Sequence, residues 1–277
     1  MKITILGCGP SGGVPMIGGA REGGIWGACN PQDPRDTRTR SSIVIETDEG
    51  TRLLVDCGPD LRAQLLRNHI ADIDALIVTH EHADHIGGFD DIRGINRVIQ
   101  RPLPLYASPD VLKSMQMRFS YAFETWSGGE FFRPVPAPQP VSAPETIAIN
   151  GTGVTFFAQR HYKVATLGLR IGNFAYSTDV EHLPEDAIEA LRGVETWVVG
   201  CLQRDPHVAH ACLDDVLRWR AEIKPSRVIL THMGPGLSYG SLAQELPPGM
   251  EPAYDSMTFD VPPGGDAKWG IRRGGGN

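Results

Sequence analysis

The feature that most constrains the fold of this chain is a run of histidines directly after a short apolar segment. Residues 75–79 (Ala-Leu-Ile-Val-Thr) are typical of a buried β-strand, and the next six positions hold His80, His82, Asp84 and His85. Polar groups at this density rarely serve a structural purpose alone. The pattern therefore predicts a β-sheet that presents metal ligands at the end of one strand.

Imidazole and carboxylate groups suit zinc, manganese and iron as ligands. The run contains no cysteine, which argues against a closed structural zinc site and favours a site that stays open to substrate. The alternative interpretation is a solvated, charged turn. That alternative would suit a lone His-x-His pair better than four potential ligands in six positions.

Three more candidate ligands lie far along the chain. His161, Asp179 and His232 each lie within two residues of the end of a predicted strand. Each one alone is more typical of a residue that caps a loop. Their common position at strand ends favours a shared site.

Strands and helices alternate along the 277 residues, which indicates one α/β domain. Residues 133–144 contain five prolines, which excludes a central strand and suggests a stiff surface connection. We expect the tail at about 265–277 to be disordered. The predicted strands span residues 2–7, 42–47, 52–57, 75–79, 103–107, 154–159, 166–171, 174–177, 197–199 and 227–231, and the predicted helices span 60–69, 89–99, 109–123, 184–191 and 211–223.

Composition narrows the classes of function. The formal net charge is −7 with both signs mixed, so the chain lacks the basic surface that extended nucleic acid requires. The first residues are too short an apolar run for a signal peptide, and no later segment is long enough to span a membrane. We therefore expect a cytoplasmic protein with a small substrate. The five cysteines are scattered and form no Cys-x-x-Cys pair, which fits reduced thiols: Cys8, Cys29, Cys57, Cys201 and Cys212.

The ordered set of candidate ligands resembles the five-motif signature of the metallo-β-lactamase superfamily. The resemblance extends from residue 2 to about residue 232. It implies an αββα four-layer sandwich, in a single hydrolase domain over residues 1–277, with metal ions at the edges of the sheets. The matching residues are Asp56, His80, His82, Asp84, His85, His161, Asp179 and His232.

Carried over position by position, the resemblance implies two divalent metal ions per chain, zinc or manganese, with iron as a further option. Asp56 would orient the loop that carries the ligands without binding an ion. The ligands would form two sets that share one bridging carboxylate: His80, His82 and His161 for one ion, Asp84, His85 and His232 for the other, and Asp179 as the bridge.

Within the superfamily the chain is similar to a phosphodiesterase branch that includes phosphoribosyl cyclic phosphodiesterase and, further off, the nucleases that process transfer RNA. Residues 6–9 (Leu-Gly-Cys-Gly) and 13–15 (Gly-Val-Pro) resemble the opening of that branch. Residues 206–210 lie where the branch carries a catalytic histidine that binds no metal. His210 is the first candidate and His207 the second; the alternative is that one of them only caps the helix near residue 211.

Two features of the N-terminal third limit the assignment. The cyclic phosphodiesterase has a structural zinc site made mainly of cysteines, whereas residues 16–30 offer only Cys29, so we expect no third ion and the narrow substrate stays open. The glycines at 7–15 do not form a nucleotide-binding loop, because Pro15 and more glycines follow where a helix would have to begin.

Of the basic residues Arg35, Arg38 and Arg40, Arg38 or Arg40 could bind a phosphate; a solvated face is the alternative.

The resemblance implies a metal-dependent hydrolase, in which a hydroxide shared by two ions about 3.5–4 Å apart attacks phosphorus. His210 would stabilise the charge on the phosphoryl oxygens, and Asp84 or His210 would assist the leaving oxygen. The expected substrate is a small, cyclic phosphodiester of a ribose or nucleotide. A thioester or lactone hydrolase and a non-catalytic metal-binding relative are the alternatives. We expect no membrane partner and no extended nucleic acid, and a homodimer by family.

Overall fold

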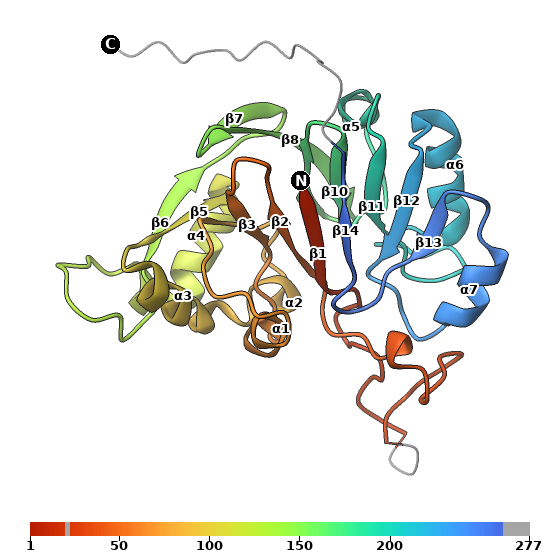
Figure 1. Cartoon of the computed structure of the whole chain (residues 1–277), viewed down its shortest axis with the longest axis horizontal. Helices are drawn as coiled ribbons and strands as arrows, with labels where there is room; N and C mark the ends of the chain where they lie inside the picture. The colour runs from red at the N-terminus through yellow and green to blue at the C-terminus, as the bar shows by residue number, and fades with distance from the viewer. Residues whose placement is uncertain (20–22, 263–277) are drawn as a thin grey trace.

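Within residues 1–19 and 23–262, which this computed structural model describes, two seven-stranded β-sheets face each other (Figure 1). In the first sheet the order is β14-β1-β2-β3-β4-β5-β6, so a strand near residue 260 pairs with the first strand of the chain. Strands β3 to β6 are parallel neighbours. Its members are β1 (Lys2–Gly7), β2 (Ser42–Glu46), β3 (Arg52–Val55), β4 (Ala75–Ile77), β5 (Leu103–Ala107), β6 (Pro136–Pro140) and β14 (Thr258–Asp260).

The second sheet has the order β13-β12-β11-β10-β9-β8-β7. Strands β7 to β10 are antiparallel neighbours, whereas β10 to β13 are parallel. The carboxyl ends of β10, β11 and β12 therefore meet at one edge of this sheet. Its members are β7 (Glu145–Ile149), β8 (Thr152–His161), β9 (Val164–Ile171), β10 (Phe174–Ser177), β11 (Thr196–Gly200), β12 (Arg227–Thr231) and β13 (Met250–Pro252).

The side chains of the first sheet alternate between two hydrophobic cores. Ile43 and Ile45 of β2 lie in the core between the sheets, while Val44 lies in the core under the outer helices. Leu53 and Leu54 of β3 divide in the same way. Alternation follows from the two-residue period of a strand, and these strands are apolar throughout because both faces are covered.

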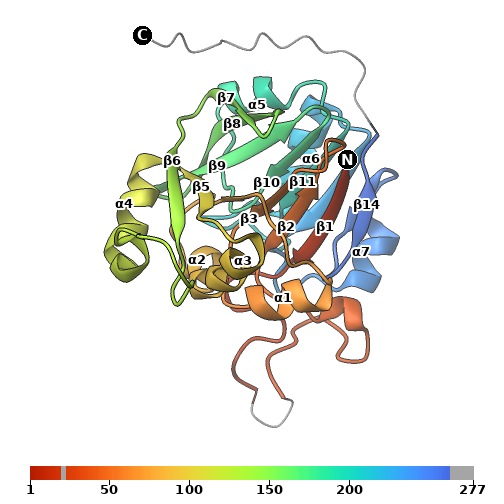
Figure 2. The same ribbon diagram turned by 60° about the vertical axis from the view of Figure 1, so that its left-hand side comes forward.

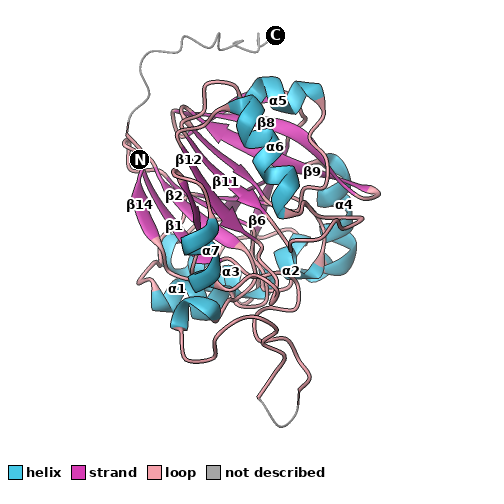
Figure 3. Ribbon diagram, turned by 90° about the vertical axis from the view of Figure 1, so that its right-hand side faces the viewer, coloured by secondary structure: helices cyan, strands magenta, loops and turns pink. Residues whose placement is uncertain are grey.

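Helices cover the outer face of each sheet (Figures 2 and 3). Buried side chains of the first four helices, such as Leu61 and Met115, pack in the outer core of the first sheet, and those of the last three, such as Trp219, pack with the second. These layers confirm the predicted αββα sandwich. The helices are α1 (Leu61–Arg67), α2 (Ala83–Ile86), α3 (Ile92–Ile99), α4 (Pro109–Arg118), α5 (Glu185–Leu191), α6 (Leu213–Ile223) and α7 (Tyr239–Glu245).

Most predicted elements lie within a few residues of the observed ones, and the differences have local causes. The predicted helices at 89–99 and 109–123 each contain a 3₁₀ turn, at Phe89–Asp91 and Ser120–Phe123. The proline-rich segment is not only a surface connection, since it contains β6, an edge strand in which missing N–H groups cost least. Strands β7, β13 and β14 and helices α2 and α7 were not predicted.

The long connection between β1 and β2 projects below both sheets in Figures 1–3. The prediction of one domain over 1–277 stays a prediction, and the tail at about 265–277 lies outside the described residues. No helix in the described part of the chain is long and apolar enough to cross a membrane.

Candidate metal centre

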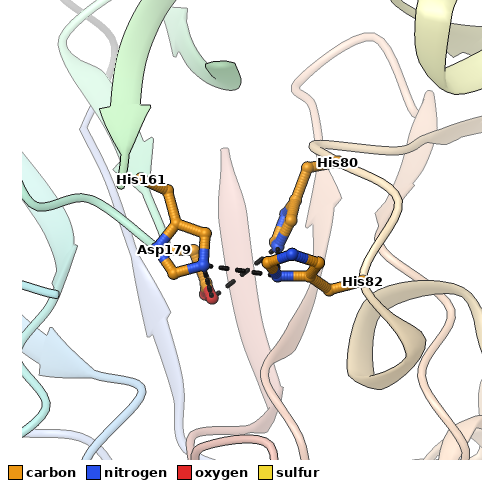
Figure 4. Close-up of side chains that lie close together, drawn as sticks. All are labelled: His80, His82, His161 and Asp179. Carbon is orange, nitrogen blue, oxygen red and sulfur yellow. Dashed lines mark hydrogen bonds and ion pairs between the residues drawn. The ribbon is translucent and has the colours of Figure 1, made fainter. Parts of the chain in front are cut away.

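The candidate ligands from distant parts of the chain meet between the ends of the two sheets. His80 and His82 follow β4 of the first sheet, whereas His161 ends β8 and Asp179 follows β10 of the second. Figure 4 shows the four side chains pointing toward one another from the two sides. His232 follows β12 at the same edge. The order of strands thus explains how residues 152 positions apart in sequence come to share a site.

The first group comprises His80, His82, His161 and Asp179, whose potential ligand atoms all lie within 4.8 Å of one another. His82 Nδ1 is 3.1 Å from His80 Nε2 and 3.3 Å from His161 Nε2. Asp179 Oδ2 is 3.7 Å from His80 Nε2 and 3.8 Å from His161 Nε2. Three nitrogens and one oxygen therefore surround a single point.

The second group comprises Asp84, His85, His232 and again Asp179, within the same 4.8 Å limit. His85 Nε2 is 3.3 Å from Asp84 Oδ2 and 3.2 Å from Asp179 Oδ1. His232 Nδ1 is 3.0 Å from Asp179 Oδ1. One oxygen of Asp179 thus faces each group, which is the arrangement expected of a bridging carboxylate.

The chemistry of these residues fits two divalent ions. His85 Nε2 is buried and has no hydrogen-bond partner, although it faces two carboxylates. Burial, followed by the charge of His85, lowers the pKa of His80 well below its usual value, so its ring is neutral and can offer a lone pair. Burial lowers the pKa of His85, but Asp179 and Asp56 outweigh burial and raise it well above its usual value, so an ion at the second group would displace the proton from its Nε2. Neutral imidazoles and carboxylates are suitable ligands for zinc and similar ions. Within the described residues, these are the two groups with such a geometry.

The carboxylates at the centre are held ionised. Burial raises the pKa of Asp179, but the nearby His232 and His85 outweigh burial and place the pKa well below its usual range. Burial also opposes ionisation of Asp84, but its close contact with His85 Nε2 and the charge of that ring outweigh burial and lower its pKa. Two buried carboxylates among imidazoles attract a cation.

A network outside the ligands orients their rings. Asp56 Oδ2 is 2.7 Å from His85 Nδ1, and Asp56 Oδ1 accepts a hydrogen bond of 2.8 Å from the Thr79 N–H. The Thr79 hydroxyl donates to Asp56 Oδ2 at 2.9 Å and lies 3.0 Å from His80 Nδ1. His161 Nδ1 donates to the Ala209 carbonyl at 2.5 Å. These contacts place the proton on one ring nitrogen and leave the other free for an ion.

Sequence reasoning identified Asp56 but missed Thr79, Ser41 and the Ala209 carbonyl. Thr79 directly precedes His80, and that adjacency is the one local signal that could have found it. The hydroxyl of Ser41 lies 3.2 Å from His232 Nδ1, across 191 positions of sequence. A backbone carbonyl such as that of Ala209 has no signature in the sequence.

Three residues of the centre have left-handed backbone conformations. The φ angles are +63° at Asp56, +45° at Asp179 and +54° at His232. Such angles are uncommon in residues other than glycine and cost roughly 1–3 kcal/mol each, so the surrounding structure must impose them. Their concentration at the ends of strands carrying candidate ligands is typical of a functional site.

The two histidines of the 206–210 segment differ in position. His210 Nδ1 is 3.9 Å from Asp179 Oδ2, and its ring lies 4.5 Å from that of His161 and 4.9 Å from that of His232. His207 is exposed and accepts a hydrogen bond from the Ala209 N–H. Neither caps the following helix, because the N-cap of α6 is Cys212. The structure therefore brings His210, and not His207, against the ligand groups.

The prediction that Arg38 could bind a phosphate is wrong. Arg38 is not a phosphate ligand, because its side chain is fully buried and both terminal nitrogens bind protein oxygens. Arg35 is exposed, pairs with Asp33 and lies over the ring of Tyr239. Arg40 is partly exposed and pairs with Asp60 at 2.9 Å, so its role in phosphate binding stays a prediction.

A family model described as a beta-lactamase superfamily domain matches residues 51–233. A solved structure described as a new diphosphatase from the PhnP family is 31% identical and covers 94% of this chain and 97% of its own, with a TM-score of 0.81. Zinc-bound PqqB from Methylobacterium extorquens has a TM-score of 0.70 over 94% of this chain and all of its own, but at 21% identity it shows a shared fold alone.

Two curated relatives extend the comparison. A protein named octanoyltransferase from Porphyromonas gingivalis is 32% identical over 93% of this chain and 51% of its own length, so this chain spans about half of that relative. An anti-Pycsar protein, Apyc1, from Bacillus phage 010DV004 is 25% identical over 70% of this chain and 82% of its own.

Proposed function

This chain belongs to the metallo-β-lactamase superfamily, and from that premise we propose that it is a metal-dependent phosphodiesterase acting on a small, cyclic phosphodiester of a ribose or nucleotide. The observation that carries the proposal is the pair of ligand groups joined through the two oxygens of Asp179. The relative described as a PhnP-family diphosphatase, similar along nearly its whole length, supports phosphorus as the atom attacked.

Two divalent ions at such a site, zinc or manganese, would polarise a phosphoryl oxygen and make water acidic enough to serve as a nucleophile at neutral pH. His80, His82 and His161 would hold one ion, and Asp84, His85 and His232 the other, with Asp179 between them. The protein itself contributes position and charge. Asp56 and Thr79 fix the rings of His85 and His80, and the Ala209 carbonyl fixes that of His161.

His210 is the residue best placed to contact the substrate. Burial, followed by the charge of His232, lowers the pKa of His210 to about 3 against the opposing charge of Asp179. A neutral ring at pH 7 suits a hydrogen-bond donor to a phosphoryl oxygen better than a proton donor to the leaving group. Asp84 is held ionised beside His85, so it would assist the leaving oxygen as a ligand of the second ion and not as a proton donor.

A cavity of about 440 Å³, whose lining includes Gly234 two residues after the ligand His232 but none of the ligands themselves, is the candidate space for the rest of the substrate. It is formed by segments that follow β1, β11 and β12, the strands whose ends lie at this edge. The one arginine of its lining, Arg204, already pairs with Glu245 at 2.6 Å. The lining therefore has no unpaired arginine to bind the phosphates of a nucleic acid. This supports a small organic group over a long polynucleotide. The lining comprises Pro10, Ser11, Gly12, Met16, Leu202, Gln203, Arg204, Asp205, Gly234, Pro235 and Gly236.

The test compares hydrolysis of bis-p-nitrophenyl phosphate, a nucleoside 2′,3′-cyclic phosphate and an acyl thioester. The protein is stripped of metal and reloaded separately with zinc and with manganese. We expect turnover of the phosphodiesters that requires metal. Thioester turnover without phosphodiester turnover would overturn the proposal, and so would metal binding without any turnover.

The His210→Ala variant tests the role of that ring. We expect it to retain both ions and to lose about 10²–10⁴-fold in turnover, the usual contribution of a positioned acid–base or hydrogen-bonding group. His207→Ala and His182→Ala are the matched controls, because both side chains are exposed. Full turnover by His210→Ala would remove this residue from the mechanism.

One observation favours a second candidate, hydrolysis of an acyl ester or thioester. The relative named octanoyltransferase matches nearly all of this chain, and its name describes transfer of an octanoyl group. This chain corresponds to only about half of that protein, so the named activity could belong to the other half. The thioester arm of the assay, run with an octanoyl substrate, decides between the two candidates.

A further inference from the structure

A buried arginine fastens the long β1–β2 connection to the loop that follows the ligand His232. The side chains of Arg38 and Asp36 are 0% and 1% exposed, and Arg38 Nη2 is 2.9 Å from Asp36 Oδ1. The same nitrogen donates to the Leu237 carbonyl at 2.5 Å, and Nη1 donates to the Met233 and Gly234 carbonyls at 3.3 and 3.2 Å. We name this set of contacts the Arg38 clamp.

Asp36 extends the clamp in two directions. Its Oδ1 accepts a hydrogen bond of 2.7 Å from the Tyr239 N–H, and its Oδ2 accepts one of 2.8 Å from the Asn30 N–H. Removing either partner of a buried ion pair leaves an uncompensated charge, which makes such a pair sensitive to substitution. The carbonyls bound by Arg38 are 195 to 199 positions away in sequence, so the clamp determines how two distant loops meet.

The clamp acts directly on the backbone that presents His232. Met233, whose carbonyl Arg38 binds, is the next residue, and its N–H donates to the Cys8 carbonyl at 2.9 Å. His232 itself has a φ of +54°, a conformation that its own side chain does not favour. At the ring itself, Ser41 contacts His232 Nδ1, the nitrogen that also faces Asp179, at 3.2 Å and donates to the Gly9 carbonyl at 2.9 Å. The β1–β2 connection thus holds His232 by its ring and by the residues after it.

Within its described residues, the β1–β2 connection has no metal site of its own that could hold the loop after His232 in place of the Arg38 clamp. Its described residues contain one cysteine besides Cys8, namely Cys29, whose thiol donates to the Leu237 carbonyl at 3.6 Å. Within the described residues, the two groups able to bind a metal are those of the centre itself.

We propose that Arg38, supported by Asp36, is a positioning residue that fixes His232 as a ligand of the second ion. The inference rests on the metal centre of the proposed function but not on its substrate. The inference predicts that loss of the Arg38 clamp weakens the binding of the second ion more than that of the first. His232 belongs to the second ligand group alone, and the two groups share only Asp179.

The test is metal binding by Arg38→Met and Asp36→Asn, with Arg170→Met as the matched control. Arg170 is also buried and donates to three carbonyls, those of Gly172, Ala190 and Arg192, at 2.7 Å each. Its partners lie at the opposite end of the second sheet, among α5 and the β9–β10 turn. Zinc content after dialysis at fixed free zinc, zinc affinity by chelator competition and the melting temperature are measured for each full-length variant.

We expect wild type and Arg170→Met to bind two ions, although Arg170→Met melts at a lower temperature. We expect Arg38→Met to keep one ion with wild-type affinity and to bind the other about 10–100-fold more weakly, as is usual when a support of a ligand is lost. Arg38→Lys, which keeps the charge but cannot reach all four oxygens, should fall between. Equal weakening of both ions, an effect matched by Arg170→Met, or unchanged binding would each overturn the inference.

If Arg38→Met does not fold, the double variant Arg38→Met with Asp36→Leu removes both charges and leaves no unpaired ion in the core. The same loss of one ion is expected from it, and retention of both ions overturns the inference. Because the readout is metal content, two ions bound without phosphodiester turnover would defeat the proposed function and leave this inference standing. Binding of a single ion by wild type would defeat the inference.

Discussion

Replacement of Asp56 by Asn changes one atom of a fully buried carboxylate and tests how the centre controls its histidines. Asp56 accepts from the Thr79 N–H at 2.8 Å and from the Thr79 hydroxyl at 2.9 Å, and its Oδ2 is 2.7 Å from His85 Nδ1. The side-chain oxygen of Asn can still accept the hydrogen bond from the Thr79 N–H. Its NH₂ group would then face His85 Nδ1, which must give up its proton to accept.

The proton of His85 would move to Nε2, the atom that faces Asp84 and Asp179 at 3.3 and 3.2 Å. An Nε2 that carries a proton cannot bind an ion. Loss of such a supporting contact weakens metal binding by about 10–100-fold, which corresponds to about 1.4–2.8 kcal/mol at 25 °C. Because His85 belongs to one ligand group only, the weakened ion should be the second.

The assay is zinc binding by competition with a chromogenic chelator, together with zinc content at fixed free zinc. Asp255→Asn is the matched control, since that buried carboxylate also accepts from a threonine N–H and hydroxyl, those of Thr39, but bonds to no histidine. We expect Asp255→Asn to bind two ions normally. Wild-type affinity for both ions in Asp56→Asn would refute the argument that this carboxylate sets the tautomer of His85.

Two further predictions need only wild-type protein. Removal of metal should lower the melting temperature, because each ion present at 100 times its dissociation constant adds about 2.7 kcal/mol to the free energy of unfolding; a melting temperature unaffected by a chelator would contradict the metal centre. All five cysteines are buried, and burial raises the pKa of Cys29 to about 11 and that of Cys201 to about 12. Since the thiolate is the reactive form, native protein should react slowly with Ellman's reagent at pH 8 and show five thiols in denaturant; rapid labelling of the native protein would show that the burial is wrong.

The strands and candidate ligands that could be predicted from the sequence are those that depend on neighbouring residues. The apolar runs before His80, Asp179 and His232 identified both the strands and the positions of candidate ligands, because strand patterns and the residues that follow them are local. Strands β10 and β12 lie at the predicted residues. The two covered sheets were expected from the family resemblance.

Sequence did not predict what depends on partners far along the chain. Strand β14 has three residues, Thr258–Asp260, and is stable because it pairs with β1 across more than 250 positions. Arg38 belongs to a basic run that resembles an exposed face, and only carbonyls some 195 positions away make it a core residue. Helix α2 has four residues, Ala83–Ile86, too few for any periodic pattern.

The division of the ligands between the two sheets has a consequence for folding kinetics. The histidine run follows the first sheet, while His161, Asp179 and His232 come from the second, so neither half of the chain alone offers a full set for either ion. An ion can bind tightly only after the halves have docked, late in folding. Interactions made after the rate-limiting step slow unfolding and leave the folding rate nearly unchanged. A bound ion would then act chiefly on the lifetime of the native state, and so on its resistance to proteases and to heat.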